Sequence, residues 1–163
     1  MKPDYRQTVL AYKDTVYRIA YSQCSCREDA EDIFQDVFLT LCREKREFDS
    51  EDHLRYWLIR VTLNYCRLLR RSAWHRKRAE VTGDIPAPET PGERDMAETV
   101  TEAVRALPEK YRAIVEMHYF EEMTCAEIGA ALKLNEATVR TRLRRGRERL
   151  REYLENDMEA VKK

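Results

Sequence analysis

The sequence predicts an all-α protein made of two small helical domains joined by a flexible linker. Through most of the 163 residues, apolar side chains recur at steps of three and four, which is the period of an amphipathic helix. No segment shows the strict alternation of a half-buried β-strand. Residues 81–92 interrupt the helical period and hold three of the five prolines and two of the four glycines. Such a composition is typical of a connection between domains.

The first domain is expected at residues 1–78 and opens with two helices. The first helix begins at Tyr5, and the second begins near Asp29. The second has an acidic first turn, which suits the positive end of the helix dipole. The apolar stripes that predict them are Val9, Tyr12, Val16 and Ile19 in the first helix and Ala30, Ile33, Phe34, Val37, Phe38, Leu41 and Cys42 in the second.

A third, strongly basic helix is expected over residues 54–74, with Ser50 before it as the N-cap. Residues 51–78 carry eight basic and two acidic side chains, a net charge of +6, although the formal net charge of the whole chain is zero. Trp57 lies on the apolar side of this helix, where we expect it to pack into the core. The polar side carries Arg60, Asn64, Arg67 and Arg71.

The predicted linker, residues 79–95, is acidic, and its composition favours a disordered tether that keeps the protein soluble. The second domain is expected at residues 96–158. Pro108 suits the first position of its second helix. Thr124 and Glu127 have the spacing of a capping box at the start of a short helix, and Asn135 suits the N-cap of the last helix.

Residues 124–142 have the spacing of a helix-turn-helix, a motif whose second helix enters the DNA major groove. Residues 136–151 carry seven basic and two acidic side chains, a net charge of +5. Lys133 stands where the turn often has glycine, so either it takes a positive φ or the turn differs. The alternative is an ordinary helical hairpin with a solvated basic face. The candidate DNA contacts, which face away from the apolar stripe, are Arg140, Thr141, Arg144 and Arg145.

No catalytic, metal or cofactor site is expected. His53, His75 and His118 lie far apart in the sequence, and the gap between Cys24 and Cys26 is wrong for the usual zinc pair. A metal or redox role for these two cysteines is the less favoured interpretation. The odd number of cysteines, five, fits reduced thiols, and no apolar run is long enough to span a membrane. We therefore expect a cytoplasmic protein without membrane insertion.

Five motifs, in this order, resemble the extracytoplasmic-function (ECF, group IV) sigma factors of bacterial RNA polymerase, which retain only sigma regions 2 and 4. The similarity covers nearly the whole chain, with the linker in the expected place. Each motif is weak alone, and their order makes the resemblance specific. They are residues 29–39 (DAEDIFQDVFL), 57–64 (WLIRVTLN), 106–112 (ALPEKYR), 127–129 (EIG) and 138–150 (TVRTRLRRGRERL).

The resemblance implies a non-enzymatic initiation factor that needs no cofactor. It would bind core RNA polymerase through the β′ clamp helices and the β flap, and direct it to promoters. Residues 1–78 would be region 2, which recognises and melts the minus-ten element, and residues 96–158 would be region 4, which reads the minus-thirty-five element. An anti-sigma factor is a further expected partner. The acidic linker would follow a polymerase channel that otherwise holds nucleic acid.

The same resemblance assigns site residues. The minus-thirty-five contacts would be the four candidates of the helix-turn-helix. For the acidic residues of the second helix, compensation of the helix dipole explains their presence equally well. The polymerase contacts would be Asp32, Gln35, Asp36 and Thr40, and the minus-ten contacts Tyr56, Arg60, Asn64, Arg67, Arg70 and Arg71.

Two other functions remain open from the residues alone. One is a stand-alone helix-turn-helix repressor or activator, in which the N-terminal domain dimerises or senses a ligand. The other is an RNA-binding or scaffold protein that uses both basic segments without reading sequence. A repressor has no need for a second basic helix carrying Arg60, Asn64 and Arg67, which favours the initiation factor. The neutral net charge predicts weak DNA binding by the isolated chain.

Overall fold

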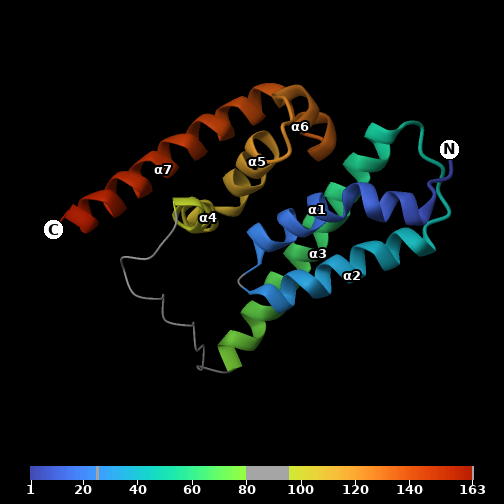
Figure 1. The fold of residues 1–163 in the computed structure, drawn as a ribbon, viewed down its shortest axis with the longest axis horizontal. Helices are drawn as coiled ribbons and strands as arrows, with labels where there is room; N and C mark the ends of the chain where they lie inside the picture. The colour runs from blue at the N-terminus through green and yellow to red at the C-terminus, as the bar shows by residue number, and fades with distance from the viewer. Residues whose placement is uncertain (25, 80–95, 163) are drawn as a thin grey trace.

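The computed structural model describes the backbone of residues 1–24, 26–79 and 96–162. Within these ranges the chain forms seven α-helices and no strand, which confirms the all-α class (Figure 1). The first three helices make an N-terminal bundle, and the last four make a C-terminal unit that ends in a long helix. Their bounds are α1 (Tyr5–Gln23), α2 (Arg27–Arg43), α3 (Glu51–Ala79), α4 (Met96–Ala106), α5 (Glu109–Tyr119), α6 (Cys125–Leu132) and α7 (Glu136–Lys162).

Two helices of the N-terminal bundle, α1 and α3, begin where a side chain caps the first turn. The Asp4 carboxylate accepts from the Gln7 amide at 3.0 Å and caps α1. Ser50 Oγ accepts from the His53 amide at 3.1 Å, as expected for the cap of α3. α2 begins two residues earlier than expected, at Arg27.

Aromatic and aliphatic side chains fill the core of this bundle. Trp57 is 6% exposed and meets Phe48 edge to face, with ring centroids 5.5 Å apart, so its predicted core role is confirmed. Val16 from α1 and Phe38 from α2 lie in the same cluster. These contacts fix α3 against α1 and α2 and leave its polar side directed away from the bundle core.

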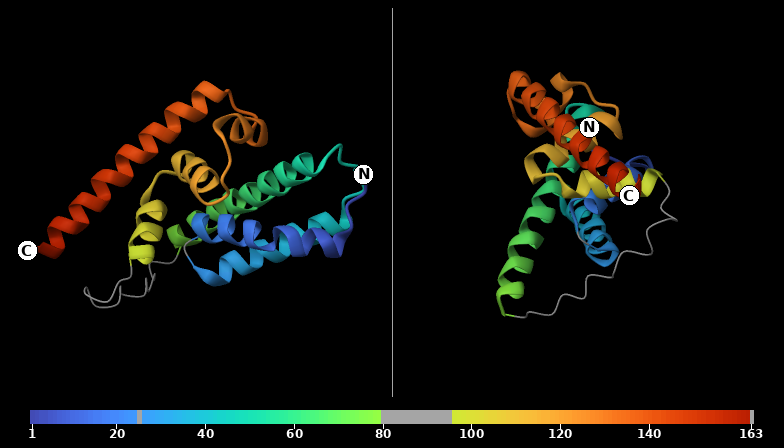
Figure 2. Two further views of the ribbon diagram at one scale, coloured as in Figure 1. Left: turned by 45° about the horizontal axis from the view of Figure 1, so that its top comes forward. Right: turned by 90° about the vertical axis from the view of Figure 1, so that its left-hand side faces the viewer.

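In the C-terminal unit, α7 packs directly on α5 because residue 146 has no side chain. A Cβ atom added to Gly146 would lie 2.8 Å from Val115 Cγ2. Pro108 is the N-cap of α5 instead of its first helical residue, so that prediction was wrong by one position. The end of α7 extends beyond the other helices (Figure 2).

The turn between α6 and α7 has the geometry of a helix-turn-helix. Lys133 takes the left-handed conformation, φ 57° and ψ 44°, so the first of the two expected alternatives holds. A Cβ on Gly129 would lie 2.8 Å from the Leu134 carbonyl oxygen, so the turn can close only over glycine. Asn135 Oδ1 accepts from the Ala137 amide at 2.9 Å and caps α7.

The capping box at α6 is only half formed. Thr124 Oγ1 accepts from the Glu127 amide at 3.1 Å, as expected. The Glu127 carboxylate accepts instead from the Thr124 hydroxyl, 3.2 Å away, and not from the backbone amide that the motif predicts. The Thr124 cap alone therefore fixes where this helix begins.

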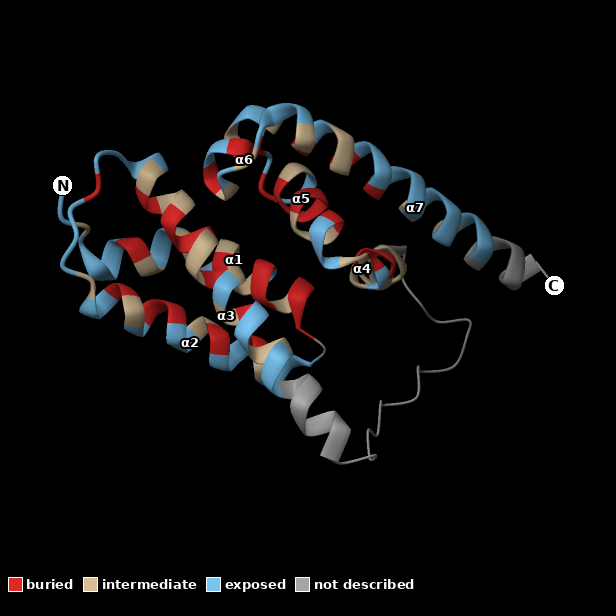
Figure 3. Cartoon of the chain, turned by 180° about the vertical axis from the view of Figure 1, so that it is seen from behind, coloured by how far each residue is buried: buried red, intermediate tan, exposed pale blue. Residues whose placement is uncertain are grey.

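The two domains pack against each other, which the sequence did not predict. Ile19 of α1 and Ile59 of α3 are buried in the same apolar cluster as Leu107, Ile114 and Ile128 of the C-terminal unit. α1 packs on α4 and α5, and α3 packs on α6. Figure 3 shows buried residues on the facing sides of both units. Ala79 closes α3, and the rest of the predicted linker lies outside the described residues.

Candidate nucleic-acid interface

The outer face of α7 carries the residues predicted to read duplex DNA. Arg140, Arg144 and Arg145 are exposed, and Thr141 is half-buried. Thr141 Oγ1 donates to the Ala137 carbonyl oxygen at 3.0 Å, within its own helix. The positive N-terminal end of this helix and its arginines together make a surface suited to phosphate and to base edges.

Two of these arginines, Arg140 and Arg145, have different neighbours within the protein. Arg140 Nη1 lies 3.1 Å from Glu136 Oε1, one helical turn earlier. Arg145 and Tyr111 of α5 line the same surface pocket. The ion pair with Glu136 orients the Arg140 guanidinium along the helix surface before any ligand arrives.

Further arginines, which sequence reasoning did not single out, extend the same stripe. Arg147 and Arg151 are exposed and follow Arg140 and Arg144 at steps of three and four, so one line of cations runs along α7. Arg147 Nε donates to the Tyr119 hydroxyl. The helical spacing was visible in the sequence and predicts this extension.

The polar side of α3 divides into an open part and a covered part. Asn64, Arg67 and Arg71 are exposed. Arg60 and Tyr56 are half-buried against the C-terminal unit, where Arg60 Nη1 donates to the Ala131 carbonyl oxygen at 3.0 Å. That carbonyl belongs to the last turn of α6, whose oxygens lack partners within the helix. One face of the predicted minus-ten surface is thus occupied by the second domain.

Glu109, in the first turn of α5, reaches the same surface. Its Oε1 lies 2.6 Å from Arg70 Nη2 and 3.4 Å from Arg67 Nε. Arg70 Nη1 also donates to Gln23 Oε1 at 2.9 Å, so Arg70 links α1, α3 and α5. A single carboxylate from the C-terminal unit therefore neutralises part of the basic face of α3.

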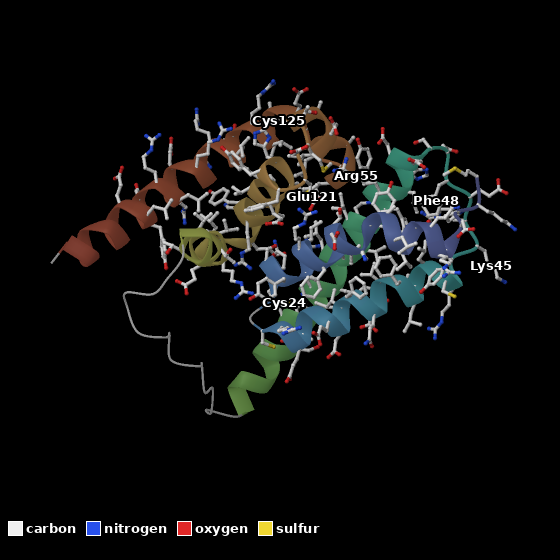
Figure 4. All side chains as sticks on the ribbon, viewed as in Figure 1. Cys24, Lys45, Phe48, Arg55, Glu121 and Cys125 are labelled. Atoms are coloured by element: carbon white, nitrogen blue, oxygen red, sulfur yellow. The ribbon has the colours of Figure 1, made fainter. Side chains whose placement is uncertain are left out.

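A second junction between the domains forms around Glu121, in the loop after α5. Its Oε2 accepts from Thr15 Oγ1 at 2.9 Å, and its Oε1 lies 3.4 Å from Arg18 Nε. Its carbonyl oxygen accepts from Arg55 Nη2 at 2.8 Å (Figure 4). The Glu121 side chain is only 4% exposed, so this loop is held firmly between α1 and α3.

A second buried carboxyl lies beside this junction. Glu116 is 5% exposed. Burial, and then the neighbouring Glu121 carboxylate, raise the pKa of Glu116 to about 7, against the opposing effect of Arg18. The charge of the seam between the domains therefore changes near neutral pH.

Between α3 and the C-terminal unit lies a cavity of about 540 Å³. Its charged lining comes from Arg67 on α3, Glu109 and Lys110 on α5, and Arg142 on α7. Arginines from both basic helices thus line the same cavity. This arrangement could not be predicted from either helix alone, because it depends on how the two domains pack.

The outer face of α2 carries the residues predicted to bind polymerase. Asp32, Gln35 and Asp36 are exposed together. Thr40, which was also predicted to contact polymerase, is half-buried, and its hydroxyl lies 2.6 Å from the Tyr65 hydroxyl. Leu39 is 49% exposed, one helical turn after Gln35 and two turns after Asp32, and was missed although its spacing places it on this face.

Among the residues that the structure describes, no three His, Cys, Asp or Glu side chains are arranged to hold a metal ion. None of the helices in these ranges combines the length and the apolar character needed to cross a bilayer.

Comparison with known families places a match on each domain. Residues 8–76 match the Sigma-70 region 2 family, and residues 97–150 match the Sigma-70, region 4 family. Together these matches cover most of the chain and leave the predicted linker between them.

Two curated relatives are similar along most of the chain. The ECF RNA polymerase sigma factor SigW of Bacillus subtilis is 30% identical over 158 residues, which cover 88% of this chain and 84% of SigW. The ECF RNA polymerase sigma factor SigE of Mycolicibacterium smegmatis is 32% identical over 160 residues, which cover 93% of this chain and 62% of that longer protein.

Two solved structures share the fold. The sigma factor RpoE from Bartonella quintana, in complex with the anti-sigma factor NepR, superposes with a TM-score of 0.76 at 19% identity and covers 93% of this chain and 97% of RpoE. CnrH, in complex with the cytosolic domain of CnrY, gives a TM-score of 0.65 at 23% identity, with 94% and 88% covered.

Proposed function

Because the chain belongs to the ECF sigma factors and is a transcription initiation factor of RNA polymerase, we propose how its residues divide that work. Residues 1–78 bind polymerase and melt the minus-ten element, and residues 96–158 read the minus-thirty-five element as duplex. The observation that carries this proposal is the presence of two strongly basic segments, α3 and residues 136–151 of α7, in a chain with no net charge. Local charge, not the total, is what a nucleic acid meets.

In the duplex-reading part, the turn at Lys133 and the cap at Asn135 direct the N-terminal half of α7 toward the major groove. Arg144 is our principal candidate for a bidentate contact with guanine, because its planar guanidinium matches O6 and N7. Arg140, Thr141 and Arg145 contact neighbouring bases or phosphates. The exposed arginines further along α7 add backbone contacts that carry no sequence information.

In the melting part, single-stranded bases need a cationic track for their phosphates and surfaces for their unstacked rings. Asn64, Arg67 and Arg71 supply the open part of this track. Arg60, Arg70 and Tyr56 complete it once the C-terminal unit moves away, since their present contacts are with that unit or close to it. This arrangement of the two domains is thus a closed form, and promoter opening requires them to separate.

Polymerase is the partner proposed to separate them. The exposed acidic face of α2, with Asp32, Gln35 and Asp36, docks on the β′ clamp helices, and Leu39 adds apolar area to this contact. The C-terminal unit binds the β flap. Two docking sites on one large partner offset the free energy that holds the domains together in the closed form.

An anti-sigma factor is the proposed antagonist, since one solved structure with the same fold is the sigma factor RpoE bound to the anti-sigma factor NepR. A second, CnrH, is bound to the cytosolic domain of CnrY. Sigma factors are non-enzymatic, and we propose that this chain has no catalytic activity or cofactor of its own and acts in the cytoplasm. A stand-alone repressor is not favoured, because residues 8–76 match sigma region 2.

The test is to mix the purified protein with core RNA polymerase and a promoter library, and to map melted bases by permanganate reactivity. We expect the protein to join the polymerase and to open DNA at one class of promoter. Asn64→Ala should reduce permanganate reactivity at the minus-ten element and leave duplex contacts at the minus-thirty-five element intact. Failure to bind polymerase, or binding without any melting, contradicts this division of labour between the domains.

A further inference from the structure

The cavity between α3 and the C-terminal unit has the size and the charge of a site for an anionic ligand. Its volume of about 540 Å³ lies within the range of about 300–1,000 Å³ that is usual for small-molecule pockets. Three cationic side chains line it, each from a different helix: Arg67 of α3, Lys110 of α5 and Arg142 of α7. Glu109 is the only carboxylate among the described lining residues, so three positive charges face one negative charge.

Arg142 separates this cavity from the DNA-reading face of α7. It lies two residues from both Arg140 and Arg144, which is more than half a helical turn, so its side chain leaves the helix on the opposite side. That side packs inward, because the adjacent Leu143 is buried, and Arg142 itself is half-buried. A duplex that lies on Arg140 and Arg144 therefore does not reach Arg142.

Arg142 also has no anionic partner in the part of the chain that the structure describes, where no carboxylate forms an ion pair with it. Glu109 is engaged elsewhere, since its Oε1 lies 2.6 Å from Arg70 Nη2 and 3.4 Å from Arg67 Nε. Withdrawing a cation from water without a counter-charge costs free energy. An anion in the cavity would supply the missing counter-charge.

The rest of the lining is apolar and comes from both domains. Leu63 belongs to α3, and the C-terminal unit supplies Pro108, Ala113, Leu132 and Leu134. Phosphate groups suit the three cations, because charge-assisted hydrogen bonds to phosphate oxygens are strong. A flat ring suits the apolar part, as in most ligand pockets. A ligand that fits both parts carries several negative charges at one end and a ring at the other.

We propose that this cavity binds a nucleoside triphosphate, with its phosphates against Arg67, Lys110 and Arg142 and its ring against the apolar lining. Arg67 belongs to the first domain and the other two cations to the second, so only the closed form assembles the site. Binding therefore shifts the equilibrium toward the closed form. It also occupies Arg67, which would inhibit promoter melting, and this last consequence rests on the proposed function.

The experiment titrates the full chain with ATP by isothermal calorimetry, without divalent cations, polymerase or DNA. We expect one ATP to bind per chain, and the affinity to fall as salt is added, because the contacts are ionic. Inorganic triphosphate should bind more weakly, since it lacks the ring, and adenosine should give no measurable binding, since it lacks phosphate. No promoter is present, so the result does not depend on the proposed division of labour between the domains.

Arg142→Gln should weaken ATP binding by about tenfold or more, as expected for the loss of one charge-assisted contact. Arg149→Gln is the matched control, because it removes the same charge at an exposed site about two helical turns further along α7, outside the cavity lining. It should leave the affinity nearly unchanged. If Arg142→Gln does not fold by circular dichroism, Lys110→Gln, at an exposed site, replaces it, with an expected loss of about two- to fivefold.

Three results overturn the proposal. One is the absence of saturable ATP binding. Another is an equal loss for Arg149→Gln and the cavity variant, which would mean diffuse attraction to the basic helices. The third is binding of inorganic triphosphate as tight as that of ATP, which would exclude the ring contact.

The coupling to domain closure has its own measurement, which is energy transfer between dyes on α2 and α7. Saturating ATP should raise the closed fraction of the unmodified protein and have no such effect on Arg142→Gln at the same concentration. An unchanged closed fraction with ATP bound would contradict the assembly of the site from both domains.

Discussion

Arg70 of α3 and Glu109 of α5 form an ion pair across the two domains, with 2.6 Å between Nη2 and Oε1. The arginine belongs to the surface proposed to hold melted promoter DNA, and the carboxylate belongs to the domain proposed to read the duplex. The same Glu109 oxygen lies 3.4 Å from Arg67. In the closed form, the Glu109 carboxylate therefore pairs with Arg67 and Arg70, the same arginines that are proposed to bind DNA phosphates.

Glu109→Gln should shift the protein toward an open form. The two side chains of the Arg70 pair are 30% and 43% exposed, so solvent screens the attraction and the loss is about 0.2–1 kcal/mol. This corresponds to a change of roughly 1.4- to 5-fold in the ratio of open to closed molecules. Single-molecule energy transfer between dyes on α2 and α7 measures that ratio.

Glu31→Gln is the matched control for this change. Glu31 pairs with Arg27 inside α2, away from the seam, at a distance of 3.1 Å. It should leave the open fraction unchanged. Added salt should open the unmodified protein more than Glu109→Gln, because salt screens the pair that the variant lacks.

Arg144→Ala should relax sequence choice at the minus-thirty-five element without affecting polymerase binding. Loss of one bidentate base contact costs about 1–3 kcal/mol of discrimination. Competition between promoter variants in a reconstituted initiation assay gives this value. Arg151→Ala, further along the exposed face of α7, should weaken all sequences equally. A uniform loss for Arg144→Ala as well would reassign that residue to phosphate contact.

Glu116→Gln should stabilise the protein at pH 8 and leave its stability at pH 4 nearly unchanged. Burial and Glu121 raise the pKa of Glu116 to about 7 in the folded protein, whereas the unfolded chain titrates near its ordinary value of about 4.3. The folded state thus binds the proton more tightly. The stabilisation that this tighter proton binding gives the folded state is fully present below about pH 4 and is lost as the pH rises to about 7.

The size of this effect is at most about 4 kcal/mol, and urea denaturation at several pH values measures it. The difference in unfolding free energy between Glu116→Gln and the unmodified protein should grow from pH 4 to pH 7 and then level off. Glu122→Gln, at an exposed site in the loop after α5, provides the control. Parallel curves for Glu116→Gln and the unmodified protein would refute the assignment.

Lys133→Gly should stabilise the C-terminal unit. Lys133 has φ 57°, a conformation that costs a residue with a side chain about 1 kcal/mol relative to glycine. Part of this gain is lost in the variant, because glycine has more conformational entropy in the unfolded chain. A rise of about 0.5–1 kcal/mol in unfolding free energy is expected. A fall would mean that the lysine side chain makes a compensating contact.

The helices and their caps could be predicted because they depend on neighbours in the sequence. Ser50, Thr124 and Asn135 cap the helices that follow them, since each bond spans only two or three residues. The misplaced Pro108 is an error of one position, which is the ordinary uncertainty of a helix boundary. The arginines of α7 were predicted to be exposed for the same local reason.

What could not be predicted depends on which faces of distant helices meet. The same basic stripe on α3 contains exposed Asn64 and covered Arg60, and only the packing of α6 distinguishes them. Thr40 has the spacing of an exposed residue, but Tyr65 from α3 lies against it. Cys24 and Cys66 likewise carry no signal in their spacing that they lie in one core cluster.

By itself, the sequence determined an all-α chain, two units, two basic helices and the resemblance to ECF sigma factors, because hydrophobic period, charge and capping act over one or two helical turns. Only the tertiary structure decided that the units close on each other, that Glu109 and Glu121 hold them, and that Glu116 is buried. These features arise from contacts between residues distant in sequence, whose free energy depends on burial and distance in three dimensions.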